Sequence, residues 1–486
     1  MRVLTVDVGS SSIKAAWCKN GNIKTSMQVD TPSVRAGRQV EMDGEQLIAA
    51  FEKVISEVMK HHKHVDAIAI DTLSPGMGLV DGKGGLLTGL ITHQDRRSFK
   101  QAQQIEEHFG VAEHQKLIGN RPIPGGIGST SLLWLKENCA PLWKKRGWMV
   151  GPATLLVHHL TGQWCMDVSH AGFTGLYATP TLGGWAPAML KFLGITEDQL
   201  PRLLWADEIA GTVKAGVAAR LGIAAGTPVL PGIVDTSAAL ISTDCHPGQM
   251  VHSSGSSDVL ALVVDGWQCN DAVLWRPLGT GRHAPARWLA VSTIAAGGSS
   301  IKWVRDQFFS EMSHKQFGKM MEKLIASLGG KKTRKNGRDD KGGADSAEGA
   351  PGEGVEFRPL LAGDRTSMEE KQAAFEGLTL STTREEMLRA VIRALGAESR
   401  RRFNDLQKIR KVNAEIYTMG GEEALANFLH SEWIRPGSWK FTRLAGEAMP
   451  GLAKLAELAL GACPSNRRDW DGSEMCRMRG GGSSRL

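Results

Sequence analysis

The stretch VLTVDVGSSSIKAAW, from Val3 to Trp17, joins an acidic residue to a run of small polar residues. An apolar run ends at Asp7, and a turn at Gly9–Ser12 leads to Lys14. Backbone N–H groups and serine hydroxyls in such a turn can surround phosphate oxygens, and the acid can hold Mg²⁺, which prefers oxygen ligands. A β-turn whose serines bond to their own backbone is the simpler alternative.

A second Gly-Ser stretch, HSSGSSDV, contains Gly255, Ser256 and Ser257 and allows the same two interpretations. The two stretches open the two halves of the chain, so we expect them to face each other across a cleft. This pairing makes a phosphate site as good an explanation as two ordinary turns.

Asp235 follows the apolar stretch PVLPGIV at the expected start of a helix. A carboxylate there can take the proton of a substrate hydroxyl while that hydroxyl attacks a phosphorus atom. The position suits a helix N-cap equally well.

Asp95, Arg96 and Arg97 follow a buried strand predicted within GLLTGLITHQ, and a helix is predicted to start near Asp95. Asp can accept hydrogen bonds from sugar hydroxyls, and Arg can donate to them. A capped helix N-terminus with solvated arginines is the alternative.

Two glycine pairs, Gly297–Gly298 and Gly420–Gly421, lie between an apolar stretch and a helical pattern. Glycines at such a turn let a nucleotide base or ribose approach the backbone closely. Simple turns are the commoner explanation of such pairs.

The elements that must position these residues alternate between strand and helix patterns. Strands are predicted at 2–9, 13–19, 23–30 and 65–71, and the spacing of apolar residues predicts a helix over 44–60. This alternation indicates packed α/β layers.

The length of 486 residues exceeds one ordinary core, so two domains are expected, at 1–245 and 246–465. The contents of 42% hydrophobic and 22% charged residues are typical of a soluble globular protein. The segment 329–354 has almost no apolar residue and is predicted to be a disordered insertion, and 466–486 to be a disordered tail.

The net charge of +7 comes largely from basic patches at 331–335 and near the C-terminus. Solvated charged segments explain these patches better than nucleic-acid binding does, so no nucleic-acid partner is expected. The seven cysteines are scattered and odd in number, which favours reduced thiols in the cytoplasm. Neither a signal-peptide pattern nor an apolar run of the ~18–20 residues that span a bilayer is seen, so no membrane association is expected.

The ordered set of stretches resembles the FGGY family of carbohydrate kinases, and within it the xylulokinase-like branch. DVGSSSIK resembles the family's first phosphate loop, D-x-G-S/T-S/T-x-K/R, and SSGSSDVLAL resembles the second. PGIVDTSAALIS is similar to the segment around the catalytic acid, PLLAGDRTS to the G-E-R signature, and MGGEEAL to the adenosine-contacting glycine pair. SPGMGLVDGKGGLLTGLITHQDRR and LTGQWCMDVSHAGFTGLYATPTLGGW are similar to two further segments of that branch. The resemblance spans Met1 to about Asn427.

The resemblance implies a two-domain α/β fold of the actin-like ATPase (ribonuclease H-like) type, with a cleft between the domains. It implies ATP-dependent phosphorylation of a small sugar or polyol, most like a ketopentose, with ATP and Mg²⁺ as cofactors. Asp7 would lie near Mg²⁺, and Asp235 would be the general base. The residues implied to bind the sugar are Met77, His93, Asp95 and Arg97. The residues implied to bind the nucleotide are Gly9, Ser10, Ser11, Ser12, Lys14, Gly255, Ser256, Ser257, Gly297, Gly298, Gly420 and Gly421.

The chain departs from the family pattern mainly around the sugar. Pro75–Gly78 stands where the branch has Q-M-H-G, His93 stands where Trp is usual, and Asp364 and Ser367 replace Glu and Pro of the signature. The phosphate loops and the base are intact, so an active kinase is the prediction. A catalytically impaired member that binds a sugar or nucleotide and regulates a partner is the alternative. A small-molecule sugar is the expected partner, and the question of a homodimer is left open.

Overall fold

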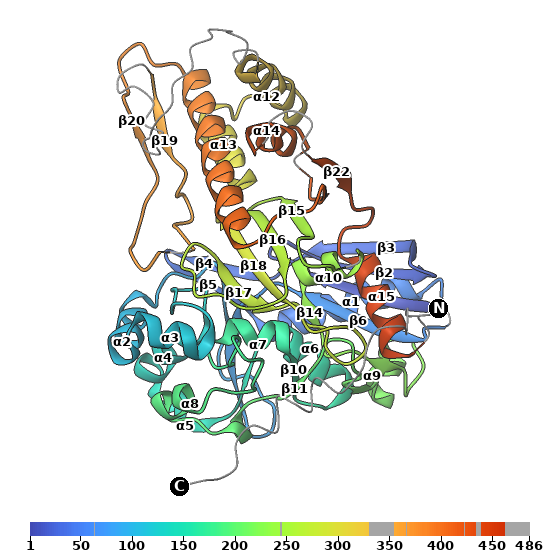
Figure 1. The fold of residues 1–486 in the computed structure, drawn as a ribbon. Helices are drawn as coiled ribbons and strands as arrows, with labels where there is room; N and C mark the ends of the chain where they lie inside the picture. The colour runs from blue at the N-terminus through green and yellow to red at the C-terminus, as the bar shows by residue number, and fades with distance from the viewer. Residues whose placement is uncertain are drawn as a thin grey trace.

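The computed structural model describes residues 1–62, 64–243, 245–329, 354–365, 367–421, 423–433 and 439–461. The insertion predicted at 329–354 lies outside these residues except for its two ends, and the tail predicted at 466–486 lies wholly outside them. The first half of the chain forms a broad body, and most elements between residues 314 and 443 stand above it (Figure 1).

Seven strands of the first half form the sheet that carries the first Gly-Ser loop. Its order is β12-β13-β6-β1-β2-β3, with β14 also paired to β6. The strands are β1 (Arg2–Val8), β2 (Ser12–Lys19), β3 (Asn22–Asp30), β6 (Ala67–Thr72), β12 (Gly211–Thr212), β13 (Pro228–Val229) and β14 (Ile233–Val234). The strands predicted from the sequence at 2–9, 13–19, 23–30 and 65–71 are therefore confirmed.

Both faces of this sheet are covered by helices. Each strand contributes side chains to both faces, because successive side chains point to opposite sides. Leu4, Val6 and Val8 join a core with α1 (Gly44–Met59), α6 (Pro152–Thr161) and α9 (Ala215–Leu221). The opposite face carries Val3, Ala16 and Cys18 and packs against α10 (Asp235–Ile241). The helix predicted at 44–60 is confirmed as α1, which begins after Asp43; the Asp43 carboxylate accepts hydrogen bonds from the next turn.

A second sheet of the first half contains most of the segment from Met77 to Arg97. Its five-stranded sheet has the order β4-β5-β8-β7-β9. The strands are β4 (Ser33–Ala36), β5 (Gln39–Met42), β7 (Gly76–Asp81), β8 (Leu90–Thr92) and β9 (Arg146–Val150). The helices beside it are α2 (Phe99–Phe109), α3 (Val111–Ile118), α4 (Gly128–Asn138), α5 (Ala140–Lys145), α7 (Val168–Thr174) and α8 (Pro187–Leu193).

The helix predicted to start near Asp95 starts later, at Phe99, so that prediction was wrong by four residues. The reason lies in Asp95, whose carboxylate bonds to Val40 and Arg97 rather than to free N–H groups of a helix.

The second half is built on a six-stranded sheet with the order β17-β18-β16-β15-β21-β22. The strands are β15 (Met250–Ser254), β16 (Asp258–Val264), β17 (Leu274–Pro277), β18 (Trp288–Ile294), β21 (Glu415–Met419) and β22 (Lys440–Arg443). Its core includes α11 (Gly298–Phe308), α12 (His314–Gly329), α13 (Arg384–Ile409) and α14 (Glu423–Trp433). Two further strand pairs are small: β10 (Cys165–Asp167) with β11 (Arg202–Leu204), and β19 (Glu356–Arg358) with β20 (Ala374–Glu376).

The last described helix, α15 (Met449–Ala459), returns to the first half of the molecule. It packs against α10, β1 and β6, and Figure 1 shows it in red beside the blue strands of the first sheet. Residues 246–465 were assigned to the second domain from the sequence, yet this helix completes the core of the first sheet.

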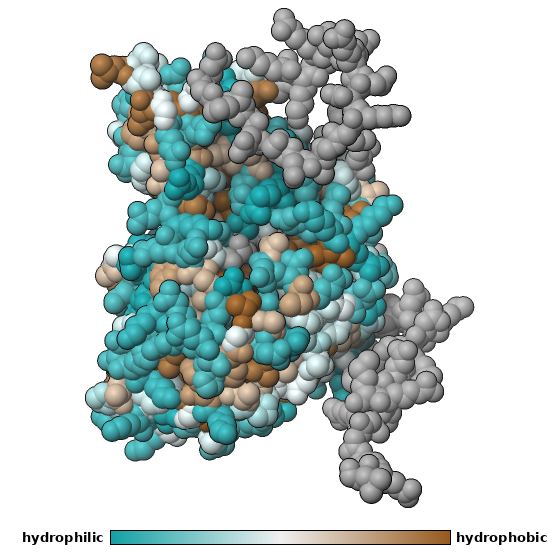
Figure 2. Space-filling model, turned by 60° about the vertical axis from the view of Figure 1, so that its left-hand side comes forward, coloured by the Kyte–Doolittle hydropathy of each residue, from teal (hydrophilic) through white to brown (hydrophobic). Residues whose placement is uncertain are grey.

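The surface is largely hydrophilic. On the face drawn in Figure 2, apolar residues gather only in small groups among hydrophilic ones. Within the part of the chain that the structure describes, no helix is long and apolar enough to cross a membrane.

Candidate active site

The first Gly-Ser loop is a tight turn between β1 and β2. The Gly9 N–H donates to the Ser12 carbonyl (3.0 Å), and the Thr31 hydroxyl donates to the Gly9 carbonyl (2.8 Å). Ser10 and Ser11 are left at the tip, where they line a large cleft. The loop is thus a turn, as the simpler interpretation has it, and its tip is available to a ligand.

The second Gly-Ser loop joins β15 to β16 and is fastened to the start of α11. The Gly298 N–H donates to the Gly255 carbonyl (2.9 Å), and the Ser299 N–H donates to the Ser256 carbonyl (3.0 Å). Ser256 lines the same cleft as Ser10 and Ser11. Two loops that are some 245 residues apart in the sequence are therefore brought to one cleft, as predicted from their pairing.

Both glycine pairs lie against this second loop. A Cβ on Gly297 would come within 2.9 Å of the Asp258 backbone nitrogen. A Cβ on Gly420, which has a φ of +100°, would lie 2.0 Å from the Ser254 carbonyl oxygen, whereas a Cβ on Gly421 would meet nothing within 4 Å. The closeness of backbone to backbone explains the first glycine of each pair, and nucleotide contact by either pair stays a prediction.

Three carboxylates converge where β1, β6 and α10 begin or end. Asp7 and Asp71 are register partners on the parallel strands β1 and β6, so their side chains leave the same face of the sheet side by side. Asp71 is fully buried, and among the described residues its carboxylate has no hydrogen-bond partner other than the Asp7 carboxyl. A buried pair of carboxylates suits Mg²⁺, which binds through one or two carboxylates and keeps several waters. The pair therefore fits a magnesium ion, with Asp7 as the ligand predicted from the sequence and Asp71 as its neighbour.

The electrostatics show how close these groups lie. Burial raises the pKa of Asp7 to about 6, and the negative charge of Asp235 adds to this rise. Burial also raises the pKa of Asp71 well above its ordinary value, with the charges of Asp7 and Asp235 contributing in the same direction. The charges of Asp7 and Asp235 therefore disfavour ionisation of Asp71, and a cation beside the Asp7–Asp71 pair would relieve that repulsion.

Asp235 is the first residue of α10, with Val234 in the capping position. Its carboxylate accepts a hydrogen bond from the Thr236 N–H at 2.6 Å. Every other residue from 231 to 241 is buried, so Asp235 has the one accessible side chain of this stretch. Beneath it, the buried Arg276 donates to the hydroxyls of Thr236 and Ser237 and holds the start of the helix. Burial lowers the pKa of Arg276 to about 10, a change that the charge of Asp235 opposes.

Asp95 and Arg97 form an ion pair inside the protein. The Arg97 Nη2 lies 2.7 Å from the Asp95 Oδ2, which also accepts the Val40 N–H at 2.7 Å, and the other guanidinium nitrogen pairs with Glu41. Asp95 is 1% exposed. Both side chains are bonded within the protein, and their direct contact with a sugar stays a prediction.

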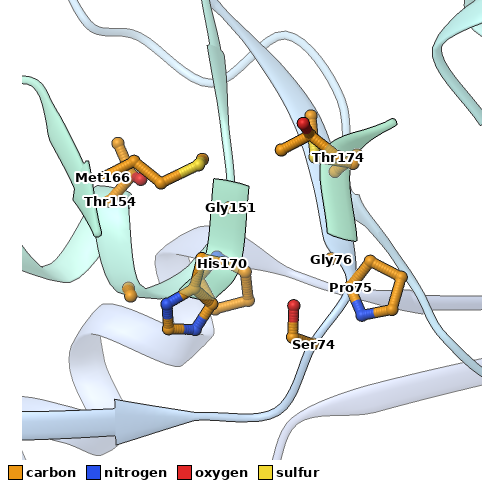
Figure 3. A pocket seen from close by; sticks show the side chains of 11 residues that line it. Ser74, Pro75, Gly76, Gly151, Thr154, Met166, His170 and Thr174 are labelled. Carbon is orange, nitrogen blue, oxygen red and sulfur yellow. The ribbon is translucent and has the colours of Figure 1, made fainter. Parts of the chain in front are cut away.

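Met77 and His93 are also buried, at 3% and 9% exposure. Met77 lines a small cavity together with Ser74, Pro75 and His170, which is seen from close by in Figure 3. The Nδ1 atom of His93 has no hydrogen-bond partner among the described residues.

A polar network ties this cavity to the carboxylates. The His170 Nδ1 contacts the Asp167 carboxylate, and its Nε2 lies 2.8 Å from the hydroxyl of Thr72, the residue after Asp71. The Ser169 hydroxyl bonds to Asp167 and accepts the N–H of Val234, next to Asp235. The network therefore fixes the ends of β6 and β14, from which Asp71 and Asp235 project.

Asp71 was not singled out from the sequence, although it had a usable signal, since it ends an apolar strand just as Asp7 does. Arg96 and Arg365 each lie in a stretch that was singled out, DRR and PLLAGDRTS. Their closeness could not be predicted, because they are some 270 residues apart and approach each other only in the fold.

Comparison with known proteins identifies the architecture. The model of the FGGY carbohydrate kinase N-terminal domain matches residues 2–242, and that of the C-terminal domain matches residues 250–427. The crystal structure of a ligand-bound xylulose kinase from Lactobacillus acidophilus is similar, with a TM-score of 0.79 and 20% identity over 98% of this chain and 91% of that one. The predicted two-domain α/β fold of the actin-like ATPase type is thereby confirmed.

Two curated relatives extend the comparison. The chain is 26% identical to an L-fuculokinase of Escherichia coli (strain K12) over 86% of this chain and 84% of the relative. It is 23% identical to a gluconokinase of Bacillus subtilis (strain 168) over 80% of this chain and 74% of the relative. From the two family models, which between them cover both Gly-Ser loops, it follows that the chain belongs to the FGGY family of carbohydrate kinases, enzymes that transfer a phosphoryl group to an alcohol.

Proposed function

We propose that the protein phosphorylates a hydroxyl of a small sugar or polyol with ATP, with Asp235 as the general base. The observation that carries this proposal is the accessible carboxylate of Asp235 close to the Asp7–Asp71 pair, in a fold that brings both Gly-Ser loops to one cleft. The relatives are named for acceptors as different as fuculose, gluconate and xylulose, so their names support the class of substrate rather than one compound. The resemblance favours a ketopentose.

In the proposed reaction, one bond to the γ-phosphorus forms, another breaks, and one proton moves to the protein. The acceptor oxygen forms a bond to the γ-phosphorus as the bond from that phosphorus to ADP breaks, and Asp235 takes the hydroxyl proton. Mg²⁺, held by Asp7 with Asp71 beside it, would offset the charge of the phosphates. The loops Gly9–Ser12 and Gly255–Ser257 would orient the phosphates from opposite sides of the cleft, so that positioning supplies much of the rate.

Release of ADP measured with a panel of ketoses, polyols and sugar acids tests this proposal. We expect at least one acceptor to raise ADP release far above the rate with water alone, and this stimulation to disappear in Asp235→Asn. If no acceptor stimulates release while one of them raises the melting temperature, the protein is instead a non-catalytic binding member of the family. The internal engagement of both Asp95 oxygens is the observation that favours this second candidate.

We also propose a cytoplasmic location. Among the described residues, Cys18, Cys139, Cys165 and Cys269 form no disulfide, as expected in a reducing compartment.

A further inference from the structure

Three arginines in the cleft form no ion pair with an acid in the part of the chain that the structure describes. Arg35 donates to the side-chain amide oxygen of Gln94 (2.6 Å), and Arg96 donates to backbone carbonyls, among them that of Pro124 (2.5 Å). For Arg365, no hydrogen bond or ion pair to another described residue is found, and its Nε is enclosed. Guanidinium groups in a partly buried site normally face a carboxylate or a phosphate.

The acids that line the same cleft are occupied elsewhere. Glu370 pairs with Arg38 at 2.5 Å. Asp364 lies near Lys371 (3.7 Å) and Arg402 (3.6 Å), and Glu369 lies near Lys371 (3.9 Å). The positive charge of Arg35, Arg96 and Arg365 is therefore not balanced by a direct ion pair with any described residue.

Arg96 and Arg365 come from the two halves of the chain and meet in the cleft that both line. Gly363, two residues before Arg365, packs against Arg96: a Cβ there would lie 3.5 Å from the Arg96 Nε. Burial and the charge of Arg96 lower the pKa of Arg365 to about 9, while the charge of Asp235 acts in the opposite direction. The two guanidinium groups are thus close to each other, and Arg365 is also within reach of the charge of Asp235.

His93 adds a neutral polar group to this corner. Burial lowers its pKa well below the ordinary value, and the charges of Arg365, Arg96 and Arg35 lower it further. A neutral imidazole with a free Nδ1 can bond to a hydroxyl without adding or removing charge. The corner therefore combines a strongly positive wall with one group suited to a polyol.

Arg96 lies in the segment predicted to bind the acceptor, and the cleft that it lines with Arg35 and Arg365 also contains Ser10, Ser11 and Ser256. Arg96 follows His93 and Asp95 in the segment that the family resemblance assigns to the sugar. Arg96 lies between Asp95 and Arg97, which form a buried ion pair with each other. Its side chain donates to the carbonyl of Pro124 and lies against Gly125.

We propose that the acceptor is a polyhydroxylated compound bearing an anionic group, either the carboxylate of a sugar acid or the phosphate of a sugar phosphate, and that Arg96 and Arg365 bind this group. The inference rests on the proposed kinase function and names the class of its substrate. Paired guanidinium groups recognise such anions through parallel, charge-assisted hydrogen bonds, which a neutral sugar cannot form.

Matched acceptors test the inference. ADP release is measured with three matched series of acceptors. They are aldonates, the alditols of equal carbon number and the corresponding sugar phosphates. We expect kcat/KM for one anionic series to exceed that for the alditols at least ~10-fold, with the better series identifying the source of the charge. Calorimetric binding of the same compounds to Asp235→Asn provides a readout that does not depend on turnover.

Arg96→Met and Arg365→Met should each lower kcat/KM for the anionic acceptor at least ~10-fold and leave that for the alditol within ~3-fold. Arg38→Met is the matched control, because Arg38 lies in the same cleft but is already paired with Glu370. If either Met variant fails to fold, Arg96→Lys and Arg365→Lys keep the charge, lose the planar fork and should show a smaller loss of the same selectivity.

Equal use of neutral and anionic acceptors would overturn this inference and leave the proposed kinase function standing. A rise in KM for ATP in the Met variants, with the preference among acceptors unchanged, would also overturn it, because the arginines would then serve the nucleotide. Absence of ADP release with every acceptor would count against the kinase function itself, and calorimetry would still report whether anions bind through Arg96.

Discussion

Asp235 combines two features that a general base needs, an accessible carboxylate and a rigid support. The residue begins α10, and the buried Arg276 holds the hydroxyls of the two residues that follow it. Asp235→Asn removes the proton acceptor and preserves shape, so we expect kcat to fall ~10²- to 10⁴-fold. Binding of ATP and of the acceptor, measured by calorimetry, should change little. Turnover near that of the wild type would show that another group accepts the proton.

The raised pKa of Asp7 makes the ligand-free protein sensitive to pH. Because this pKa is about 6 in the folded state and near 3.8 in the unfolded chain, folded protein holds a proton that unfolded chain has released between these values. The contribution of Asp7 to stability is therefore full below about pH 4 and is lost as the pH rises through about 6. A difference of about 2 pH units corresponds to roughly 3 kcal/mol.

Asp7→Asn should accordingly melt at a higher temperature than the wild type at pH 7.5 in a chelating buffer, with the gap shrinking toward pH 4.5. Asp30→Asn, at an exposed acid of the same sheet, serves as control and should show no such gap. A wild-type protein that melts higher at pH 7.5 would contradict the electrostatic account. Added Mg²⁺ should reduce the gap, because a bound cation stabilises the ionised carboxylate.

At the scale of single residues, the sequence indicates Asp7 and Asp235 as candidate site residues. Each lies where a strand meets a Gly-Ser turn or the start of a helix. It does not reveal that the Asp95 oxygens are consumed by Arg97 and Val40. The bond from Val40 depends on the packing of β5 beside β8, which brings residues 55 positions apart into contact.

At the scale of elements, Gly420 decides how closely β21 and the loop after β15 approach each other. Gly420→Ala would place a Cβ against the Ser254 carbonyl at a positive φ, so we expect a loss of stability on the order of 2 kcal/mol or more and a raised KM for ATP. Gly421→Ala is the matched control, since its Cβ would meet no neighbour. Equal melting temperatures and KM values for the two variants would show that the loop tolerates displacement.

The strands and the first helix could be predicted because their apolar spacing and turn residues agree. Asn20 and Gly21, for instance, both adopt a positive φ in the predicted turn between β2 and β3. The start of α2 could not be predicted, because Asp95 has the same local signature as a helix cap and only its distant partners distinguish the two uses.

At the scale of the molecule, α15 couples the end of the described chain to the helix that carries Asp235. The helices cross at Gly451, where a Cβ would lie 1.8 Å from the Ala238 carbonyl oxygen. Gly451→Ala should therefore push α15 off α10, lowering the melting temperature and kcat together. Gly216→Ala, at an exposed position of α9 with open space around it, should keep both within error or raise stability slightly. Unchanged kcat in a clearly destabilised Gly451→Ala protein would show that α15 does not support the base.

The two-part architecture and its cleft were predictable from chain length and from the paired Gly-Ser loops. The return of α15 was not, because its apolar stripe fits any sheet face of similar width, and nothing local says which half it covers.

The position of α15 has a consequence for how the protein is made. During synthesis the ribosome releases β1 and β6 long before residues 449–459, so the part of this sheet face that α15 covers stays open until those residues emerge. Nascent chains cut at residue 245 would expose Val3, Ala67, Leu230 and Ile241 to other chains. A fragment of the first half should therefore aggregate when expressed alone and become soluble when a peptide spanning α15 is supplied.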